Sequence, residues 1–426
     1  MIMKALTKIS IGFLALVAVA LWFTSCSSED VAQNGSSQSD KESLLTLTIN
    51  TGKIMGSRTT DWTSDPAGTD ASQTESKISA ITIGIFDGTT GNVKAIIEPK
   101  KGTGATPGEN EFTYNTTDTK ITAKVIAKAL SANDDVLVAV NYPGKFASVS
   151  DKKSFNAVTE SLSEALGAGS KQDNTHIPMY GTGKLVASTS TNSFKADDIA
   201  VKRLLSKVTL DNLSVNFSGI YANAEFTPTC CFLINVPKNL KFADGEDSWD
   251  MSASATLYSG WASYDSSTGS FNYSTKNKDI VGDFNEFLTT HNLPGTTSAL
   301  RGTDVYGGSS SPSKVYFYTM PNGNDKTTNK NTKLVIAGKF KANSTAQEQM
   351  VYYPVPLNVN IAGGKETPGL AGEDIYKVYP NKNYKCTVTI KTIGVANANL
   401  NLDKQDATIT IKVEDWTSVN QTTIFD

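Results

Sequence analysis

Large aliphatic residues alternate with polar ones in two short stretches, one near each end of the chain. In the first stretch the aliphatic residues are Leu45, Leu47 and Ile49, and in the second they are Ile409, Ile411 and Val413. Such strict alternation predicts a β-strand that buries one face and leaves the other in water, because successive side chains of a strand point to opposite faces. The two stretches share one pattern, so each would fit the same kind of groove.

Further strands are expected along most of the chain, which is rich in Ser, Thr, Asn and Gly and therefore favours short strands and turns. The run 93–97 is expected to be the hairpin partner of 78–86. Pro354 and Pro356 suit an edge strand. Apolar runs bounded by turn residues predict strands at 45–49, 78–86, 93–97, 136–140, 213–217, 230–236, 315–318, 334–340, 352–361, 384–393 and 407–413.

One short helix is expected in this otherwise all-β chain. Phe155, Val158, Leu162 and Leu166 recur at helical spacing, and Gly167 is a stop signal. Residues 241–313 are loop-rich and yield no assignment. The simplest architecture is two β-sandwich domains in tandem, with a junction near residues 203–211.

The start of the chain has the features of a secretory signal. A short positive region precedes the apolar run Ile11–Phe23, which is too short to span a bilayer comfortably. Thr24–Cys26 follows and resembles a bacterial lipobox, in which the cysteine becomes the first mature residue and carries lipid; Phe23 stands where that family usually has leucine. Ser27–Asp30 resembles the surface-export signal of Bacteroidetes lipoproteins. An ordinary signal peptide with a chance cysteine is the alternative.

The charge balance and the scarcity of histidine argue against several classes of function. With 39 basic and 42 acidic residues the net charge is −3, whereas a nucleic-acid binder needs a basic face. His176 and His291 are the only histidines, too few for a multi-histidine metal centre. Asp134–Asp135 and Asp197–Asp198 could offer oxygens to calcium, but not at the spacing of a calcium loop. Motifs of common enzyme classes are absent. We expect no enzyme, no cofactor and no metal site.

Three cysteines follow Cys26, and they cannot all pair within one chain. Cys230 and Cys231 lie in an apolar run that predicts a strand, so one is expected in the core and the other facing outward. Buried free thiols, including Cys386, are favoured over a disulfide. No spacing suggests zinc.

Arginine is rare, and one of the three arginines stands in an informative place. Arg58 lies in a loop directly after the Leu45 strand, whereas Arg203 lies in an apolar run and Arg301 in the loop-rich region. A cut after Arg58 would release the Leu45 strand with the N-terminal tether and open an apolar groove. The equivalent strand of another copy could fill this groove by β-strand addition. The alternative is that Arg58 is an ordinary surface residue and the Leu45 strand a permanent edge.

Head-to-tail growth would follow from such an exchange. Donor and groove lie at opposite ends of the chain, so the contacts do not close into a dimer and instead extend a filament.

Several short motifs are similar to those of the Bacteroidales fimbrillins, the FimA-like and Mfa-like subunits of type V pili. They are the lipobox, the early strand with Arg58, and the runs Ile177–Gly181, Arg203–Val208 and Ile409–Trp416. The resemblance implies two transthyretin-like β-sandwich domains, export as an outer-membrane lipoprotein, cleavage between Arg58 and Thr59 by an Arg-specific (gingipain-like) protease, and polymerisation by strand exchange.

On this resemblance the chain divides into four parts. They are a lipoprotein signal peptide (1–25), a lipidated propeptide (26–58), an N-terminal sandwich (59–205) and a C-terminal sandwich (206–426). Cys26 would carry the lipid, with palmitate among its acyl chains. The displaced strand would contain Leu45, Leu47 and Ile49, and the donor strand Ile409, Ile411 and Val413.

The expected product is a stalk subunit of an adhesive cell-surface fimbria. Its partners would be other copies of itself, anchor and tip subunits, the protease and, before processing, the outer membrane. A surface-exposed glycan-binding outer-membrane lipoprotein is the alternative, since Trp261 with Tyr258 and Tyr264 could stack on a sugar. A secreted hydrolase is a third reading, motivated by size and secretion alone.

Overall fold

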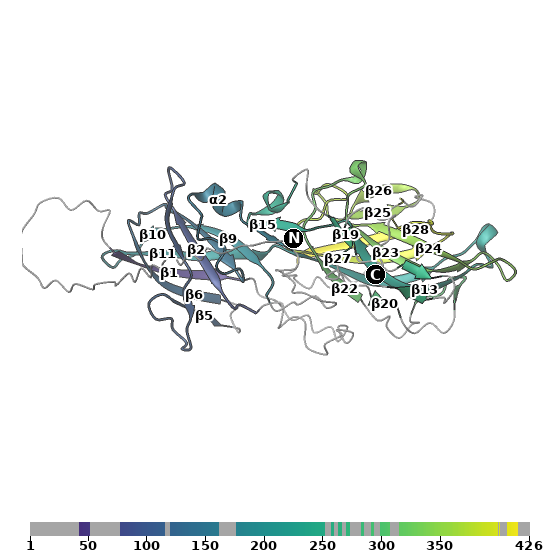
Figure 1. Cartoon of the computed structure of the whole chain (residues 1–426), viewed down its shortest axis with the longest axis horizontal. Coiled ribbons are helices and arrows are strands. Elements are labelled where there is room, and N and C mark those ends of the chain that lie inside the picture. The colour runs from purple at the N-terminus through teal and green to yellow at the C-terminus, as the bar shows by residue number, and fades with distance from the viewer. Residues whose placement is uncertain are drawn as a thin grey trace, which may run out of the picture. The chain divides into compact units, whose positions relative to one another are not determined.

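The structure, a computed structural model, describes residues 42–51, 77–115, 120–161, 176–251, 257–259, 263–265, 270–272, 283–284, 291–293, 299–306, 315–398, 400 and 407–415. Within these ranges the chain is mostly β-strand, and the α-helix it contains is the single turn α2 (Lys152–Asn156) (Figure 1). The fold class expected from the sequence, all-β with a minor helix, is confirmed. In the described ranges no helix is long and apolar enough to cross a membrane.

The N-terminal half is built on one continuous path of paired strands. In spatial order these are β3 (Val93–Ile97), β2 (Ile81–Phe86), β7 (Asp135–Val140), β9 (Met179–Lys184), β11 (Ser193–Arg203), β1 (Glu42–Asn50), β6 (Lys120–Lys128), β5 (Glu111–Asn115) and β4 (Lys100–Lys101), with β10 (Val186–Ala187) also on β11. The predicted hairpin of β2 and β3 is confirmed. Strand β11 pairs with β1 over its first part and with β9 over its last, so it joins two layers.

These two layers close on an aliphatic core. Side chains of β1 and β6 from one layer and of β2 and β7 from the other form one buried cluster, in which every second residue of each strand takes part. The period of two follows from the pleat of the strands. The opposite face of β2 and β7 is also covered, and there Phe86 packs edge-to-face on Phe155 of α2 at 5.7 Å between ring centroids.

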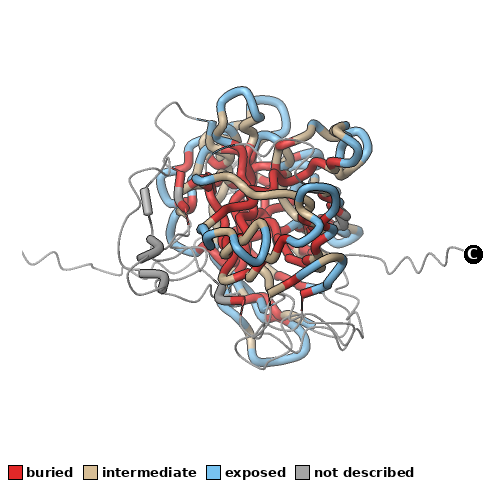
Figure 2. The backbone as a smooth tube through the Cα atoms, turned by 90° about the vertical axis from the view of Figure 1, so that its right-hand side faces the viewer, coloured by how far each residue is buried: buried red, intermediate tan, exposed pale blue. Residues whose placement is uncertain are grey.

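The C-terminal half is a second sandwich. One sheet runs β22 (Val315–Thr319), β12 (Ser206–Val215), β27 (Lys382–Ile390), β28 (Ala407–Asp415), β25 (Val359–Ala362) and β26 (Lys365–Pro368). The facing sheet runs β20 (His291–Asn292), β13 (Glu225–Ile234), β23 (Lys333–Lys341) and β24 (Gln349–Pro356), with β21 (Leu300–Arg301) on β13. Strand β24, which contains Pro354 and Pro356, ends the second sheet, as those prolines predicted. The single strand expected over 352–361 is wrong, because the chain leaves β24 after Pro356 and continues as β25 in the other sheet. Figure 2 shows the buried backbone gathered inside the exposed loops.

Short elements complete the described chain. Small pairings join β8 (Thr159–Ser161) to β15 (Asn239–Lys241), β14 (Val236–Pro237) to β16 (Leu257–Ser259) and β19 (Asp283–Phe284), and β17 (Ser263–Asp265) to β18 (Ser270–Asn272). Single 3₁₀ turns are η3 (Gly219–Tyr221), η4 (Gly245–Ser248) and η6 (Lys326–Thr328).

The chain changes sheets between β11 and β12, across Leu204 and Leu205. Contacts nevertheless continue across this point. β8 of the first half pairs with β15 of the second, and Tyr142 stacks on Phe242 at 5.0 Å between ring centroids. Because one hydrophobic cluster holds residues of both halves, the division into domains at 205–206 stays a prediction.

The helix expected over 155–166 is wrong in its described part. The helix α2 starts at Lys152 because Asp151 and Ser154 form a capping box, in which the Ser154 amide donates to Asp151 Oδ1 at 2.6 Å. It ends at Asn156, and residues 159–161 are strand β8, held by backbone pairing with β15. Residues 162–175 lie outside the described ranges.

The expectation that one of the paired cysteines faces outward is also wrong. Cys230 and Cys231 point to opposite faces of β13, yet both are fully buried. Cys231 belongs to the core between the two sheets, whereas Cys230 packs under Tyr352 and Ala398 on the outer face. Both thiols and that of Cys386 are free, which confirms the favoured reading.

Phe242 should be a main support of the contact between the halves. It is fully buried and packs against Tyr142 and Phe146. Phe242→Ala should lower the free energy of unfolding by about 3–5 kcal/mol in urea titrations. The control Ile220→Ala, at a side chain that is 88% exposed, should stay within about 0.5 kcal/mol of wild type. Equal stabilities of the two variants would contradict this packing.

The three buried thiols should resist labelling in the folded chain. Burial raises the pKa of Cys230 to about 12 and also raises the pKa values of Cys231 and Cys386, so the reactive thiolate is scarce at pH 8. In full-length chain carrying Cys26→Ser, a colorimetric thiol reagent should react rapidly with the three cysteines in denaturant and only slowly without it. Rapid reaction of the folded chain would contradict their burial.

Candidate functional site

Strand β1 is an interior strand. It pairs antiparallel with β6, from Glu42 opposite Lys128 to Asn50 opposite Lys120, and parallel with β11 on its other side. The alternative in which the Leu45 strand forms a permanent edge is therefore wrong. Backbone groups of β1 are satisfied by partners on both sides, although the two partner strands come from distant parts of the sequence.

The two faces of β1 differ as the alternation predicts. Leu45, Leu47 and Ile49 are each 0% exposed and lie in the aliphatic core of the N-terminal half. Thr46 and Thr48 on the other face are half-buried. Removal of this strand would leave a slot one strand wide, walled by β6 and β11 and floored by apolar side chains.

Charged residues follow the rim of this slot. Lys124 on β6 and Lys195 on β11 both stand opposite Thr46. Further along, the pairing of β1 with β11 slips at a β-bulge, because residues 197 and 198 both fall opposite Thr48. Asp198 has a left-handed backbone (φ 58°) at this bulge, and its Oδ1 accepts a hydrogen bond from Asn50 Nδ2 at 3.1 Å.

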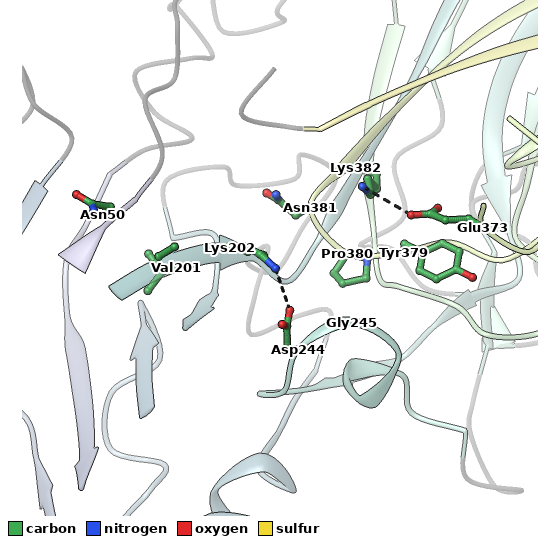
Figure 3. Close-up of a pocket in the computed structure, with 11 residues that line it drawn as sticks. Asn50, Val201, Lys202, Asp244, Gly245, Glu373, Tyr379, Pro380, Asn381 and Lys382 are labelled. Carbon is green, nitrogen blue, oxygen red and sulfur yellow. Dashed lines mark hydrogen bonds and ion pairs between the residues drawn. The ribbon is translucent and has the colours of Figure 1, made fainter. Parts of the chain in front are cut away.

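A cleft opens where β1 ends. It has a volume of about 480 Å³ and lies between the end of β1, the end of β11, the η4 turn and the segment before β27 (Figure 3). Two ion pairs line it, Lys202 with Asp244 at 3.4 Å and Lys382 with Glu373 at 3.7 Å between nitrogen and oxygen. Its remaining lining residues are Asn50, Ala200, Val201, Gly245, Tyr379, Pro380 and Asn381.

The terminal strand β28 lies in the C-terminal sheet. It pairs along its whole length with β27, from Lys382 opposite Asp415 to Ile390 opposite Ala407. Ile409 and Ile411 are buried in the core of that half. The side chain of Val413 lies outside the described part of the structure. The first and last strands, alike in pattern, thus occupy different sheets of one chain.

The two arginines that the structure describes, Arg203 and Arg301, differ in exposure. Arg203 is 1% exposed at the end of β11. Arg301 is exposed, but it stands in β21, paired with β13, and its guanidinium contacts Glu225 Oε1 at 2.8 Å. Arg58 and Thr59, together with the lipidation candidate Cys26, lie outside the described ranges.

Two of the aspartates considered for calcium, Asp134 and Asp135, form ion pairs with lysines. Lys94 contacts the buried Asp134 at 2.8 Å, and Asp135 is held by Lys152 and Lys184 at 3.0 and 2.9 Å. Burial alone would raise the pKa of Asp135, but the two lysines outweigh it and lower that pKa. Among the described residues, no three His, Cys, Asp or Glu side chains come together as a metal site.

The aromatic cluster considered for sugar stacking cannot be placed. Trp261 and the side chains of Tyr258 and Tyr264 lie outside the described part of the chain. Lys120, Asp198 and Lys202 carry no local sequence signature. The pairing of β1 with its two neighbours identifies Lys120 and Asp198, and the cleft at the end of β1 identifies Lys202.

Comparisons with known proteins bear on the fold. No protein-family model matches the sequence, and no curated protein matches it. A solved structure from Bacteroides eggerthii, provisionally described as a cell adhesion protein, is 17% identical, covers 90% of this chain and 98% of its own length, and aligns with a TM-score of 0.54. A provisionally described cell adhesion protein from Parabacteroides distasonis is 14% identical, with coverages of 88% and 100% and a TM-score of 0.56.

A fimbrilin, FimA, from Porphyromonas gingivalis aligns over a similar extent. It is 16% identical, covers 88% of this chain and 99% of its own length, and has a TM-score of 0.52. These alignments extend over nearly the whole of each chain at low identity. The chain therefore has the fold of a Bacteroidales fimbrilin.

Proposed function

We propose that this chain is a stalk subunit of an adhesive cell-surface fimbria, assembled head to tail by strand exchange after proteolysis at Arg58. The observation that carries the proposal is the interior position of β1, whose three aliphatic side chains are fully buried. The fold shared with a fimbrilin and with provisionally described cell adhesion proteins supports it.

Cleavage after Arg58 would leave β1 without a covalent link to the rest of its sandwich. Loss of β1 exposes unpaired backbone on β6 and β11 and an apolar slot between them, a state that favours pairing with another strand. The slot selects a strand with aliphatic residues at every second position, because the pleat places those side chains inward.

The environments of Arg203 and Arg301 make both poor targets for a protease, which supports Arg58 as the processing site. A protease needs an exposed segment that can lie extended in its active site. Arg203 is buried, and Arg301 is held by strand pairing and an ion pair. Arg58 follows Thr51, the last described residue after β1, in a run rich in Gly, Ser and Thr.

The donor is β28, whose inward residues Ile409 and Ile411 match Leu45 and Leu47 in spacing. In the single chain this strand already pairs with β27, so donation requires that it leave its own sheet. The lipid on Cys26 holds the precursor at the outer membrane until cleavage. Anchor and tip subunits would complete the fimbria.

Arg58→Ala should block assembly. The variant should keep its N-terminal segment and remain a lipid-bound monomer, because β1 stays in its slot. Electron microscopy of surface appendages and mass spectrometry of the mature N-terminus measure both effects, and wild type should start at Thr59. Arg301→Ala is the matched control and should assemble normally. Filaments of the Arg58→Ala variant would show that this bond is not the trigger.

Pinning β28 in its own sheet should also block assembly. Thr387 and Thr410 stand directly opposite each other on β27 and β28, on the face away from the core. A disulfide in the double variant Thr387→Cys, Thr410→Cys should prevent donation, while cleavage after Arg58 proceeds. Mass spectrometry verifies the bond, and a reductant should restore filaments. Filaments built from fully oxidised subunits would exclude β28 as the donor.

A further inference from the structure

The slot left by β1 admits an incoming strand in few registers. A shift by one residue would turn every aliphatic side chain outward, so only even shifts and a reversed strand remain. In the in-phase register Ile409, Ile411 and Val413 take the places of Leu45, Leu47 and Ile49. Each of these three places is fully buried in the precursor, and each then receives a branched aliphatic side chain.

The charges of the donor match the rim in this register. Lys412 takes the place of Thr48, beside the bulge that carries Asp198. Glu414 takes the place of Asn50, directly opposite the exposed Lys120 on β6. Asp198 also lies near this position, and Lys412 beside it offsets its charge. Opposite charges on neighbouring strands favour the pairing, and like charges oppose it.

Other registers fail on packing or charge. A shift of two in one direction puts Asp415 into the aliphatic core at the place of Ile49, whereas the in-phase register puts it at the buried polar position of Thr51. A shift of two in the other direction puts Ala407 into the place of Leu45. A reversed strand centred on Leu47 puts Lys412 at Thr46, between Lys124 and Lys195.

The in-phase register carries the donor chain into the cleft at the end of β1. Asn50 stands opposite Ala200 on β11, so the residue two further along, which is Trp416 in the donor, falls beside Lys202. The cleft there offers Tyr379 and Pro380 as apolar surface (Figure 3). An indole placed over the exposed ammonium of Lys202 would also gain a cation–π contact.

We propose that this cleft receives Trp416 of a second copy, and that the tryptophan and the rim charges hold the incoming strand in a single register. The inference rests on the proposed strand exchange and adds to it the segment recognised, Lys412–Trp416, and the residues that recognise it.

Site-directed disulfide trapping tests the register. Full-length chains carrying Lys202→Cys are mixed with chains carrying Trp416→Cys, cleaved with an Arg-specific protease and mildly oxidised. Cleavage removes Cys26, and the remaining native thiols are buried. Non-reducing gels should show linked pairs, joined at 202 and 416 by mass spectrometry, whereas either chain alone should show none. Lys365→Cys, an exposed position on β26 that does not line the cleft, replaces Lys202→Cys as control and should give no link.

A charge swap provides an independent readout. Lys120→Glu should slow filament elongation by up to about fivefold, and copies that also carry Glu414→Lys should recover. If wild-type chains form filaments while the cysteine variants give no 202–416 link or the charge swap gives no recovery, the register is overturned and the proposed function stands. A link formed within an uncleaved chain carrying both cysteines would place Trp416 in its own cleft and overturn the exchange between copies. Wild-type chains that stay monomeric after cleavage would overturn the proposed function as well.

Discussion

The burial of three aliphatic side chains of β1 holds the two layers of the N-terminal sandwich together. Complete burial of one such side chain contributes about 1.5–3 kcal/mol, so the three together contribute about 5–9 kcal/mol as an upper bound. That sum is comparable with the whole net stability of a typical domain, about 5–15 kcal/mol. The N-terminal sandwich therefore needs either β1 or a strand of the same pattern. Because β1 precedes the rest of its sandwich in the sequence, one cut after it would free it for the exchange proposed above, whereas one cut beside a strand in the middle of the sandwich would not.

The local periods of the sequence predict the strands well, because the pleat is a local property. Alternation places Leu45, Leu47 and Ile49 on one face, and the structure buries that face. Prolines predicted the edge position of β24, where missing amide donors are tolerated. Pairing partners are not local. Asn50 meets Asp198 across 148 positions of sequence, so no pattern near β1 could distinguish an interior strand from a permanent edge.

Two predictions were wrong because segments distant in the sequence pair with, or pack over, the residues concerned. The helical spacing of Phe155 and Val158 is real, but β8 gains backbone partners from β15 that a longer helix would forfeit. The capping box at Asp151 and Ser154 is the local signal that marks the true start of α2. One of Cys230 and Cys231 was expected to face outward because strands alternate, but the segment around Ala398 covers the outer one, Cys230. The sequence alone could not identify the charged residues at the rim of the slot for the same reason, because the role of a single lysine or aspartate depends on which strand it faces.

The moment at which β28 of another copy could replace β1 would depend on how each strand is attached to its chain. Before cleavage β1 is tethered beside its slot, and a short tether gives an effective concentration in the millimolar range. A competing β28 from another copy is far more dilute and must first leave β27, so exchange is disfavoured although both strands offer similar side chains. In the proposed mechanism, cleavage after Arg58 would remove the tether without altering any contact of β1. The strand would then dissociate and be diluted, whereas each β28 would remain attached to a subunit held in the growing filament. Cutting one bond would thus reverse which of the two strands is favoured in the slot, and assembly would await proteolysis although β1, its slot and β28 are all present in every chain.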